Sequence, residues 1–263
     1  MFYVQWSGDS PIWRFVKMKR PLIILLILVL TIGAFAGCGP DQEKIQNGFI
    51  AILDKPASDE TIEEAADYLA QYLPKAGEEH ASQMVHQYEH YILGYNQEGI
   101  DYEEWINRYQ KYISPSLMEL YEMMAAEQKS PMAEDTVLKL TWEALAQKTY
   151  EIEQFVRDNK DYKLIRDDLI WIYGKYMNAL VMGTNGTPIF DYKTHAFSES
   201  AKTAYASFIN KYPDSTTAWA LTEYFTYLDS VGYAMDYNDK VTSKLFFDTC
   251  DWLVSESGKR VFQ

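Results

Sequence analysis

Apolar residues recur every three or four positions along most of the chain, and this spacing predicts amphipathic α-helices. The strongest pattern covers residues 135–160 and contains Leu138, Trp142, Leu145, Thr149, Ile152 and Val156. After a polar turn at 157–161, a second stripe contains Tyr162, Ile165, Leu169, Ile172, Tyr176 and Leu180. Two long stripes joined by a short polar turn predict an antiparallel helical hairpin.

Capping residues and prolines predict the ends of further helices. Ser58 is followed by acidic residues, which is typical of a helix start, and Pro74 should end or kink that helix. The pair Ser114-Pro115 predicts another start, with proline at the first helical position. The helix between them is expected to bury a face made of Met84, Tyr88, Tyr91 and Tyr95.

The segment 204–224 has the sequence of two short helices around a tight turn. Pro213 should stop the first helix, and Asp214 or Ser215 can cap the second. This aromatic-Pro-Asp-Ser turn resembles the tetratricopeptide-like repeats of bacterial envelope proteins. Repeat arrays need about three units, and no clear second copy is present, so the resemblance favours helical hairpins without establishing a repeat protein.

No convincing pair of alternating strand patterns appears in the chain. We therefore expect an all-α fold, with helical hairpins packed as an irregular bundle or a short tetratricopeptide-like array. One long irregular segment, 183–197, interrupts the helices. Segments of this length in compact domains often bind a ligand or partner, although a plain connector is the alternative.

The N-terminal region has a different pattern. Three basic residues at positions 17–20 precede an apolar run that ends at Cys38, and this order is typical of a secretory signal. The last residues, Ala34-Phe-Ala-Gly-Cys38, resemble the lipobox of bacterial lipoproteins, with Phe35 where that family usually has leucine. The resemblance implies that residues 18–37 are a signal peptide, and that Cys38 receives a lipid such as palmitate and becomes the first mature residue.

An uncleaved transmembrane anchor is the alternative interpretation of this run. It reaches only the lower edge of the roughly 17–25 residues that span a bilayer, and residues 39–43 lack a basic flank. Both interpretations place the rest of the chain on the extracytoplasmic face of the cell membrane. Because Met18 is a natural start for such a signal, we expect residues 1–17 to be an upstream leader that is not translated.

Residues 38–44 are expected to be a short tether before one all-α extracytoplasmic domain at 45–263. The tether would extend only about 20 Å, so the domain should lie close to the membrane. The expected partners are therefore the membrane, through the N-terminal lipid, and a protein of the cell envelope.

The chain is strongly acidic, with a formal charge of −14. Removing residues 1–37 takes away four basic residues and one acidic residue, which leaves −17. This charge argues against nucleic acid as a partner, because nucleic-acid binding needs a basic surface. Once Cys38 is lipidated, Cys250 is the only thiol. The lack of a disulfide pair favours a Gram-positive surface, and we expect Cys250 to be buried.

One segment has the spacing of metal ligands. His86, Glu89 and His90 match the H-x-x-E-H pattern of a zinc protease class, in which two histidines bind the metal and the glutamate acts as base. However, His86 lies about 200° around the helix from Met84 on the expected buried face. We therefore expect His86 and His90 to face solvent, and we assign no metal, cofactor or catalytic residue.

These observations favour a membrane-anchored surface lipoprotein that acts as a protein- or ligand-binding helical module rather than an enzyme. The glycine-rich and nucleophile motifs of common enzyme classes are not visible in the sequence. Two alternatives stay open. One is a metal-dependent hydrolase that uses His86, Glu89 and His90. The other is the solute-binding lipoprotein of an importer, a family that is typically larger and two-lobed α/β.

Overall fold

The computed structural model of the chain describes residues 41–95 and 99–263. The signal segment, Cys38, the expected leader at 1–17 and the first part of the tether lie outside the described residues. Among the helices that are described, none combines the length and the apolar character needed to cross a bilayer.

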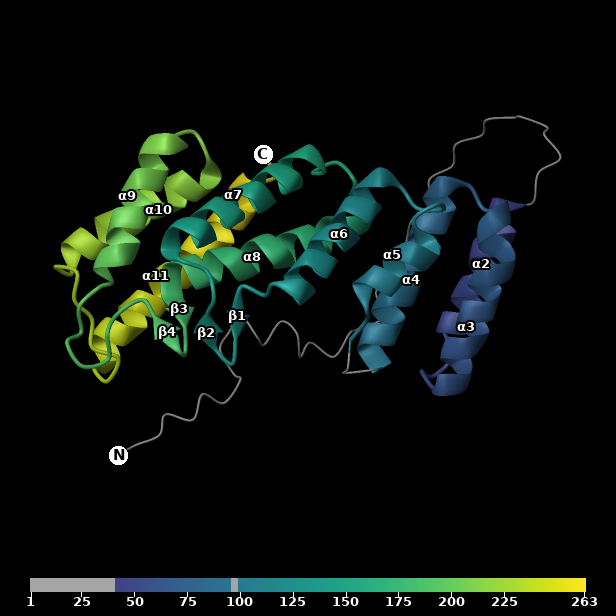
Figure 1. The fold of residues 1–263 in the computed structure, drawn as a ribbon, viewed down its shortest axis with the longest axis horizontal. Helices are drawn as coiled ribbons and strands as arrows, with labels where there is room; N and C mark the ends of the chain where they lie inside the picture. The colour runs from purple at the N-terminus through teal and green to yellow at the C-terminus, as the bar shows by residue number, and fades with distance from the viewer. Residues whose placement is uncertain (1–40, 96–98) are drawn as a thin grey trace. The chain divides into compact units, whose positions relative to one another are not determined.

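Helices dominate the described part of the chain, so the all-α expectation is confirmed (Figure 1). The α-helices are α2 (Gln42–Leu53), α3 (Asp59–Tyr72), α4 (Glu78–Tyr95), α5 (Tyr102–Tyr109), α6 (Pro115–Lys129), α7 (Trp142–Asp158), α8 (Arg166–Met182), α9 (Glu199–Lys211), α10 (Thr216–Ser230) and α11 (Lys240–Arg260). The short elements are η1 (Leu73–Lys75), η2 (Lys163–Ile165), β1 (Ala133–Glu134), β2 (Val137–Leu138), β3 (Gly183–Thr184) and β4 (Thr187–Pro188).

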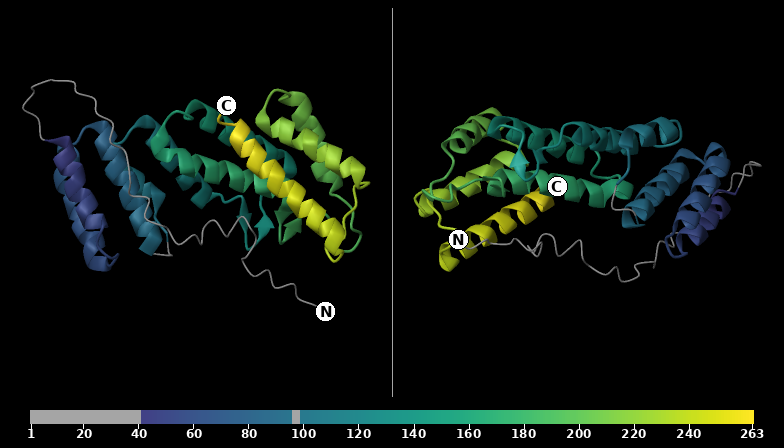
Figure 2. Two further views of the ribbon diagram at one scale, coloured as in Figure 1. Left: turned by 180° about the vertical axis from the view of Figure 1, so that it is seen from behind. Right: turned by 60° about the horizontal axis from the view of Figure 1, so that its bottom comes forward.

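The expected helical hairpin is formed by α7 and α8, which pack side by side (Figures 1 and 2). Apolar residues of both stripes, including Leu145 and Leu169, are fully buried. The first helix begins later than its pattern suggests, because Thr141 caps α7 by accepting a hydrogen bond from the Ala144 backbone N–H. Leu138, the first residue of the expected stripe, belongs instead to β2.

Three of the predicted helix starts are confirmed by their capping side chains. Ser58 caps α3 and forms a reciprocal capping box with Thr61. Ser114 caps α6, where Pro115 is the first helical residue. Ser215 caps α10 by accepting from the Ala218 N–H. These side chains satisfy backbone donors that have no partner within their own helix.

The expected tether at 38–44 overlaps the start of the first described helix. The Asp41 carboxylate accepts a hydrogen bond from the Lys44 N–H and caps α2, which begins at Gln42. Residues 42–44 are therefore the first turn of a helix. Gln42 also joins α2 to the start of α4, because its side-chain oxygen accepts from the Gly77 N–H at 2.8 Å.

The structure contains two tight β-hairpins that the sequence did not predict. The β1–β2 turn has Asp135 and Thr136 at φ values of 47° and 69°. The β3–β4 turn docks against it, with the Gly186 N–H donating to the Thr136 carbonyl at 2.9 Å. A side chain at Gly186 would clash with Thr136, because an added Cβ would lie 2.8 Å from that carbonyl oxygen.

The segment 183–197 is held by backbone pairing over part of its length. After β3 and β4, Phe190 and Phe197 pair through an isolated β-bridge, and both side chains are buried. Their rings meet edge to face, with centroids 5.3 Å apart. Ile189, Phe190 and Phe197 of this segment therefore contribute to the core, while residues 191–194 are exposed.

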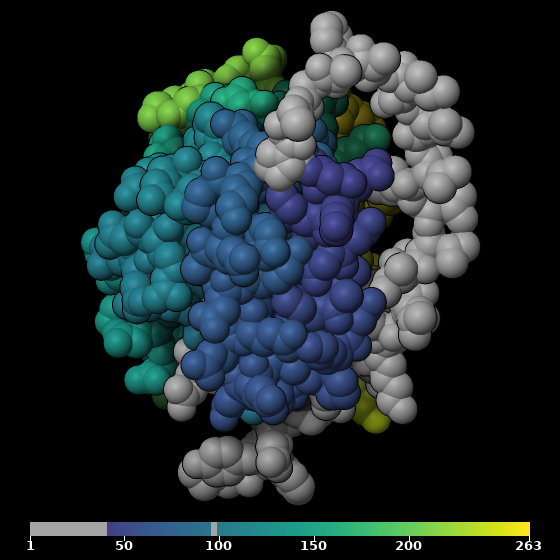
Figure 3. All heavy atoms as spheres, turned by 90° about the vertical axis from the view of Figure 1, so that its right-hand side faces the viewer, coloured from purple at the N-terminus to yellow at the C-terminus, as the bar shows by residue number. Residues whose placement is uncertain are grey.

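Helices α2, α3 and α4 pack against one another, and their purple and blue atoms lie side by side in Figure 3. Met84 and Tyr88 of α4 are buried as expected, whereas Tyr95 is 43% exposed. Tyr88 stacks on Trp105 of α5 at 5.6 Å, and Trp105 in turn contacts Tyr121 of α6. These rings connect α2–α4 to the rest of the bundle. Cys250 is fully buried, as expected.

Candidate metal centre

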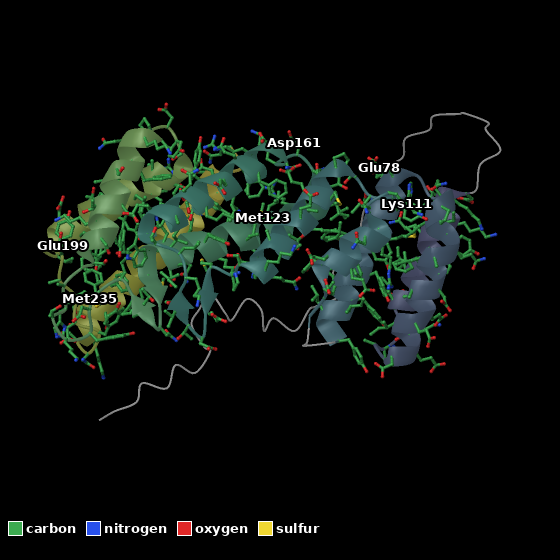
Figure 4. All side chains as sticks on the ribbon, viewed as in Figure 1. Glu78, Lys111, Met123, Asp161, Glu199 and Met235 are labelled. Atoms are coloured by element: carbon green, nitrogen blue, oxygen red, sulfur yellow. The ribbon has the colours of Figure 1, made fainter. Side chains whose placement is uncertain are left out.

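Helix α4 buries two faces, and this corrects the expectation that its histidines point to solvent. His86 is only 8% exposed, while the His90 side chain is 38% exposed. One buried face carries Met84 and packs with α2 and α3. The opposite face carries Ser82 and His86, which contact the residue before α6 and the first turn of α8. Figure 4 labels Glu78, the first residue of this helix.

His86, His90 and Asp168 form a triangle of side chains in contact. The Nε2 atom of His86 lies 2.9 Å from Oδ2 of Asp168 and 3.1 Å from Nε2 of His90. The third side joins Nε2 of His90 to Oδ1 of Asp168 at 3.3 Å. Asp168 belongs to α8, so the triangle connects two helices that are far apart in sequence.

Protons cannot satisfy all three sides of this triangle. If both Nε2 atoms carry a proton, each can donate to its own oxygen of Asp168, but the two nitrogens then lie 3.1 Å apart with no hydrogen bond between them. If only one carries a proton, the other presents a lone pair to the Asp168 carboxylate. With neither protonated, lone pairs oppose one another on every side. A cation at the centre would satisfy all three groups at once.

The spacing of the three groups fits a small transition-metal ion. Zinc binds histidine nitrogen and carboxylate oxygen at about 2.0–2.2 Å in tetrahedral geometry, so neighbouring donor atoms lie roughly 3.3 Å apart. The three contacts, at 2.9, 3.1 and 3.3 Å, are close to that value, and the two contacts to Asp168 involve different oxygens of its carboxylate. Small adjustments of the side chains would bring all three donors to bonding distance.

Asp168 is held as an anion in this position. Burial would raise the pKa of Asp168, but hydrogen bonds and charge interactions with His86 and His90 outweigh it and hold the pKa well below its usual range. Its place in the first turn of α8 adds to this effect, because exposed backbone N–H groups there favour a negative charge. An ionised carboxylate is the form that binds a metal ion.

Glu89 lies beside the triangle and is 4% exposed. Its Oε1 atom accepts a hydrogen bond of 2.6 Å from the Tyr102 hydroxyl, while its Oε2 atom has no hydrogen-bond partner. One donor atom each from His86, Glu89 and His90 fall within 4.8 Å of one another. Burial raises the pKa of Glu89, and the Tyr102 hydrogen bond and the two histidines oppose that rise.

The structure thus brings together the three residues of the H-x-x-E-H segment and adds Asp168, which sequence reasoning missed. The polar residues Ser82, His86 and Glu89 recur every three or four positions on α4, and this stripe was the available signal of a second buried face. The 183–197 segment gives no comparable cluster. There, the Asp191 carboxylate folds back onto the Lys193 and Thr194 N–H groups.

Comparison of the chain with protein-family models, with curated proteins and with solved structures gives no match.

Proposed function

We propose that this chain is a lipid-anchored, extracytoplasmic helical protein that binds a divalent transition-metal ion through His86, His90 and Asp168. The observation that carries the proposal is the convergence of two imidazole nitrogens and a carboxylate, with the two nitrogens 3.1 Å apart and each within 3.3 Å of an Asp168 oxygen. Two imidazoles and a carboxylate favour zinc or a similar ion over magnesium and calcium, which prefer oxygen ligands alone.

Metal binding gives the ligand-binding module expected from the sequence a defined ligand. It is compatible with a protein partner at the cell envelope. The all-α fold of the described residues weighs against the importer-associated solute-binding alternative, which is typically α/β. The hydrolase alternative depends on whether a water molecule can occupy a coordination position beside Glu89.

Zinc binding is the direct test. The full chain, purified in detergent and stripped with a chelator, is expected to take up about one zinc ion, measured by elemental analysis and by competition with a zinc indicator. His86→Ala should weaken binding by more than the 10–100-fold that loss of an outer-shell partner costs. His80→Ala is the matched control, because His80 lies on the same helix but outside the triangle. Failure of the wild-type chain to retain zinc would contradict the proposal.

The lipid anchor has its own test at Cys38. In a Gram-positive host, the wild-type chain is expected to incorporate labelled palmitate and to partition into the membrane fraction. Cys38→Ser should lose the label, because the lipid is attached through that thiol in the lipoprotein family that the segment resembles. Cys250→Ser is the control, since the other cysteine is buried in the folded domain. A membrane-bound wild-type chain without label would instead support the uncleaved anchor.

A further inference from the structure

We infer that Glu89 is the fourth protein ligand of this centre, so that two imidazoles and two carboxylates enclose the ion. The inference rests on the proposed metal binding and adds that no coordination position is left for a reactive water. It therefore assigns the centre to the closed class of metal sites, in which the ion holds the protein together, rather than to the hydrolytic class.

The position of Glu89 on α4 allows it to bind the same ion as the histidines. Residues three and four apart on a helix lie on one face, so His86, Glu89 and His90 project in similar directions. Paired ligands at this three-residue spacing are also found in helical bundles that bind di-iron centres. Donor atoms of these three residues already lie within 4.8 Å of one another.

The free oxygen of Glu89 is an independent sign of a missing ligand. Its Oε2 atom is buried and has no hydrogen-bond partner. Buried polar atoms in native proteins are nearly always paired, and an exception calls for an explanation such as a bound ion. Coordination would give Oε2 a partner, while the Tyr121 hydroxyl, which is also buried and unpaired, interacts with the same carboxylate.

Tyr102 fixes which oxygen of Glu89 remains free. Its hydroxyl donates to Oε1 at 2.6 Å. The backbone N–H of Tyr102 donates in turn to the side chain of Gln128 on α6 at 3.1 Å, which holds the start of α5 in place. Tyr102 is therefore a positioning residue, since it orients the carboxylate without contacting the ion.

Charge balance also favours four protein ligands. Two neutral imidazoles and two carboxylates carry a total charge that a divalent ion cancels. A buried charge without compensation is unfavourable, and both Glu89 and His86 are buried. With Asp168 and Glu89 both bound, the centre would be neutral.

Cobalt(II) replacing zinc in the full chain tests the ligand count. A four-coordinate cobalt ion absorbs visible light much more strongly than a six-coordinate one, so the wild-type chain should give an intense tetrahedral spectrum. Glu89→Gln is expected to weaken zinc binding by more than the 10–100-fold that loss of an outer-shell partner costs and to change the cobalt spectrum. Tyr102→Phe leaves the ligand set intact and should weaken binding by about tenfold with the spectrum unchanged.

Glu79→Gln is the matched control, because Glu79 is an exposed acid on the same helix. Unchanged zinc affinity and cobalt spectrum in Glu89→Gln, together with loss of zinc in His86→Ala, would overturn the fourth ligand and leave the proposed function standing. Hydrolysis of 4-nitrophenyl acetate by the zinc form, abolished in Glu89→Gln, would also overturn the closed site. Absence of zinc from the wild-type chain would instead contradict the proposed function.

Discussion

Glu153→Ala is expected to lower the free energy of unfolding by about 3–5 kcal/mol, the cost typical of breaking a buried charged network. The Glu153 side chain on α7 is fully buried. Its Oε1 atom accepts from the Thr216 N–H at 2.7 Å, and its Oε2 atom accepts from the Thr217 N–H and hydroxyl at 2.8 Å each. One carboxylate thus caps the start of α10 from a different helix.

The effect is large because the substitution leaves several groups without partners. The backbone donors at the start of α10 have no partner inside that helix, and each buried, unpaired polar group costs about 1–3 kcal/mol. Arg157, whose Nε lies 3.1 Å from Glu153, would also lose its carboxylate. Ser215 would still cap the Ala218 N–H, so α10 should form but dock less firmly on α7.

Urea denaturation of the full chain in detergent, followed by circular dichroism, measures this change. Glu151→Ala is the matched control, because Glu151 lies on α7 two residues earlier and its side chain is 53% exposed. The control should differ from wild type by less than about 0.5 kcal/mol. If Glu153→Ala were as stable as the control, the cap from α7 would not contribute to the fold.

The features that the sequence predicts well are those encoded by neighbouring residues. The stripes of α7 and α8 repeat every three or four positions, and the caps at Ser58 and Ser114 lie beside the helices they start. Each signal lies within a few residues of the structure it specifies. The β-hairpins escaped prediction because two-residue strands are too short to show an alternating pattern.

The candidate metal centre was not predictable in the same way. Apolar periodicity reveals only the apolar face of α4. The second buried face carries Ser82, His86 and Glu89, and this polar pattern predicts exposure to solvent. Asp168 meets His86 from 82 residues away, and the partners Glu153 and Thr216 are 63 residues apart. Contacts of this kind depend on how the helices pack, which no local pattern records.

Zinc is expected to raise the unfolding temperature of the chelator-treated chain by roughly 5–10 °C. A ligand at about 100 times its dissociation constant adds about 2.7 kcal/mol, and each kcal/mol corresponds to about 2–4 °C for a domain of this size. The unfolded chain cannot hold the same site, because its ligands come from α4 and from α8. The ion should therefore stabilise the docking of α2–α4 on the rest of the bundle.

Asp168→Ala tests whether zinc stabilises the chain by joining α4 to α8 or only by binding the histidines of α4. A 100-fold loss of affinity at the same zinc concentration should reduce the shift to below about 2 °C. Asp167→Ala is the matched control. Asp167 is exposed, lies beside Asp168 in the first turn of α8, and makes no contact with the histidines. Calorimetry with and without zinc measures both variants. A full shift in Asp168→Ala would mean that the ion stabilises α4 without linking it to α8, because the remaining ligands all belong to that one helix.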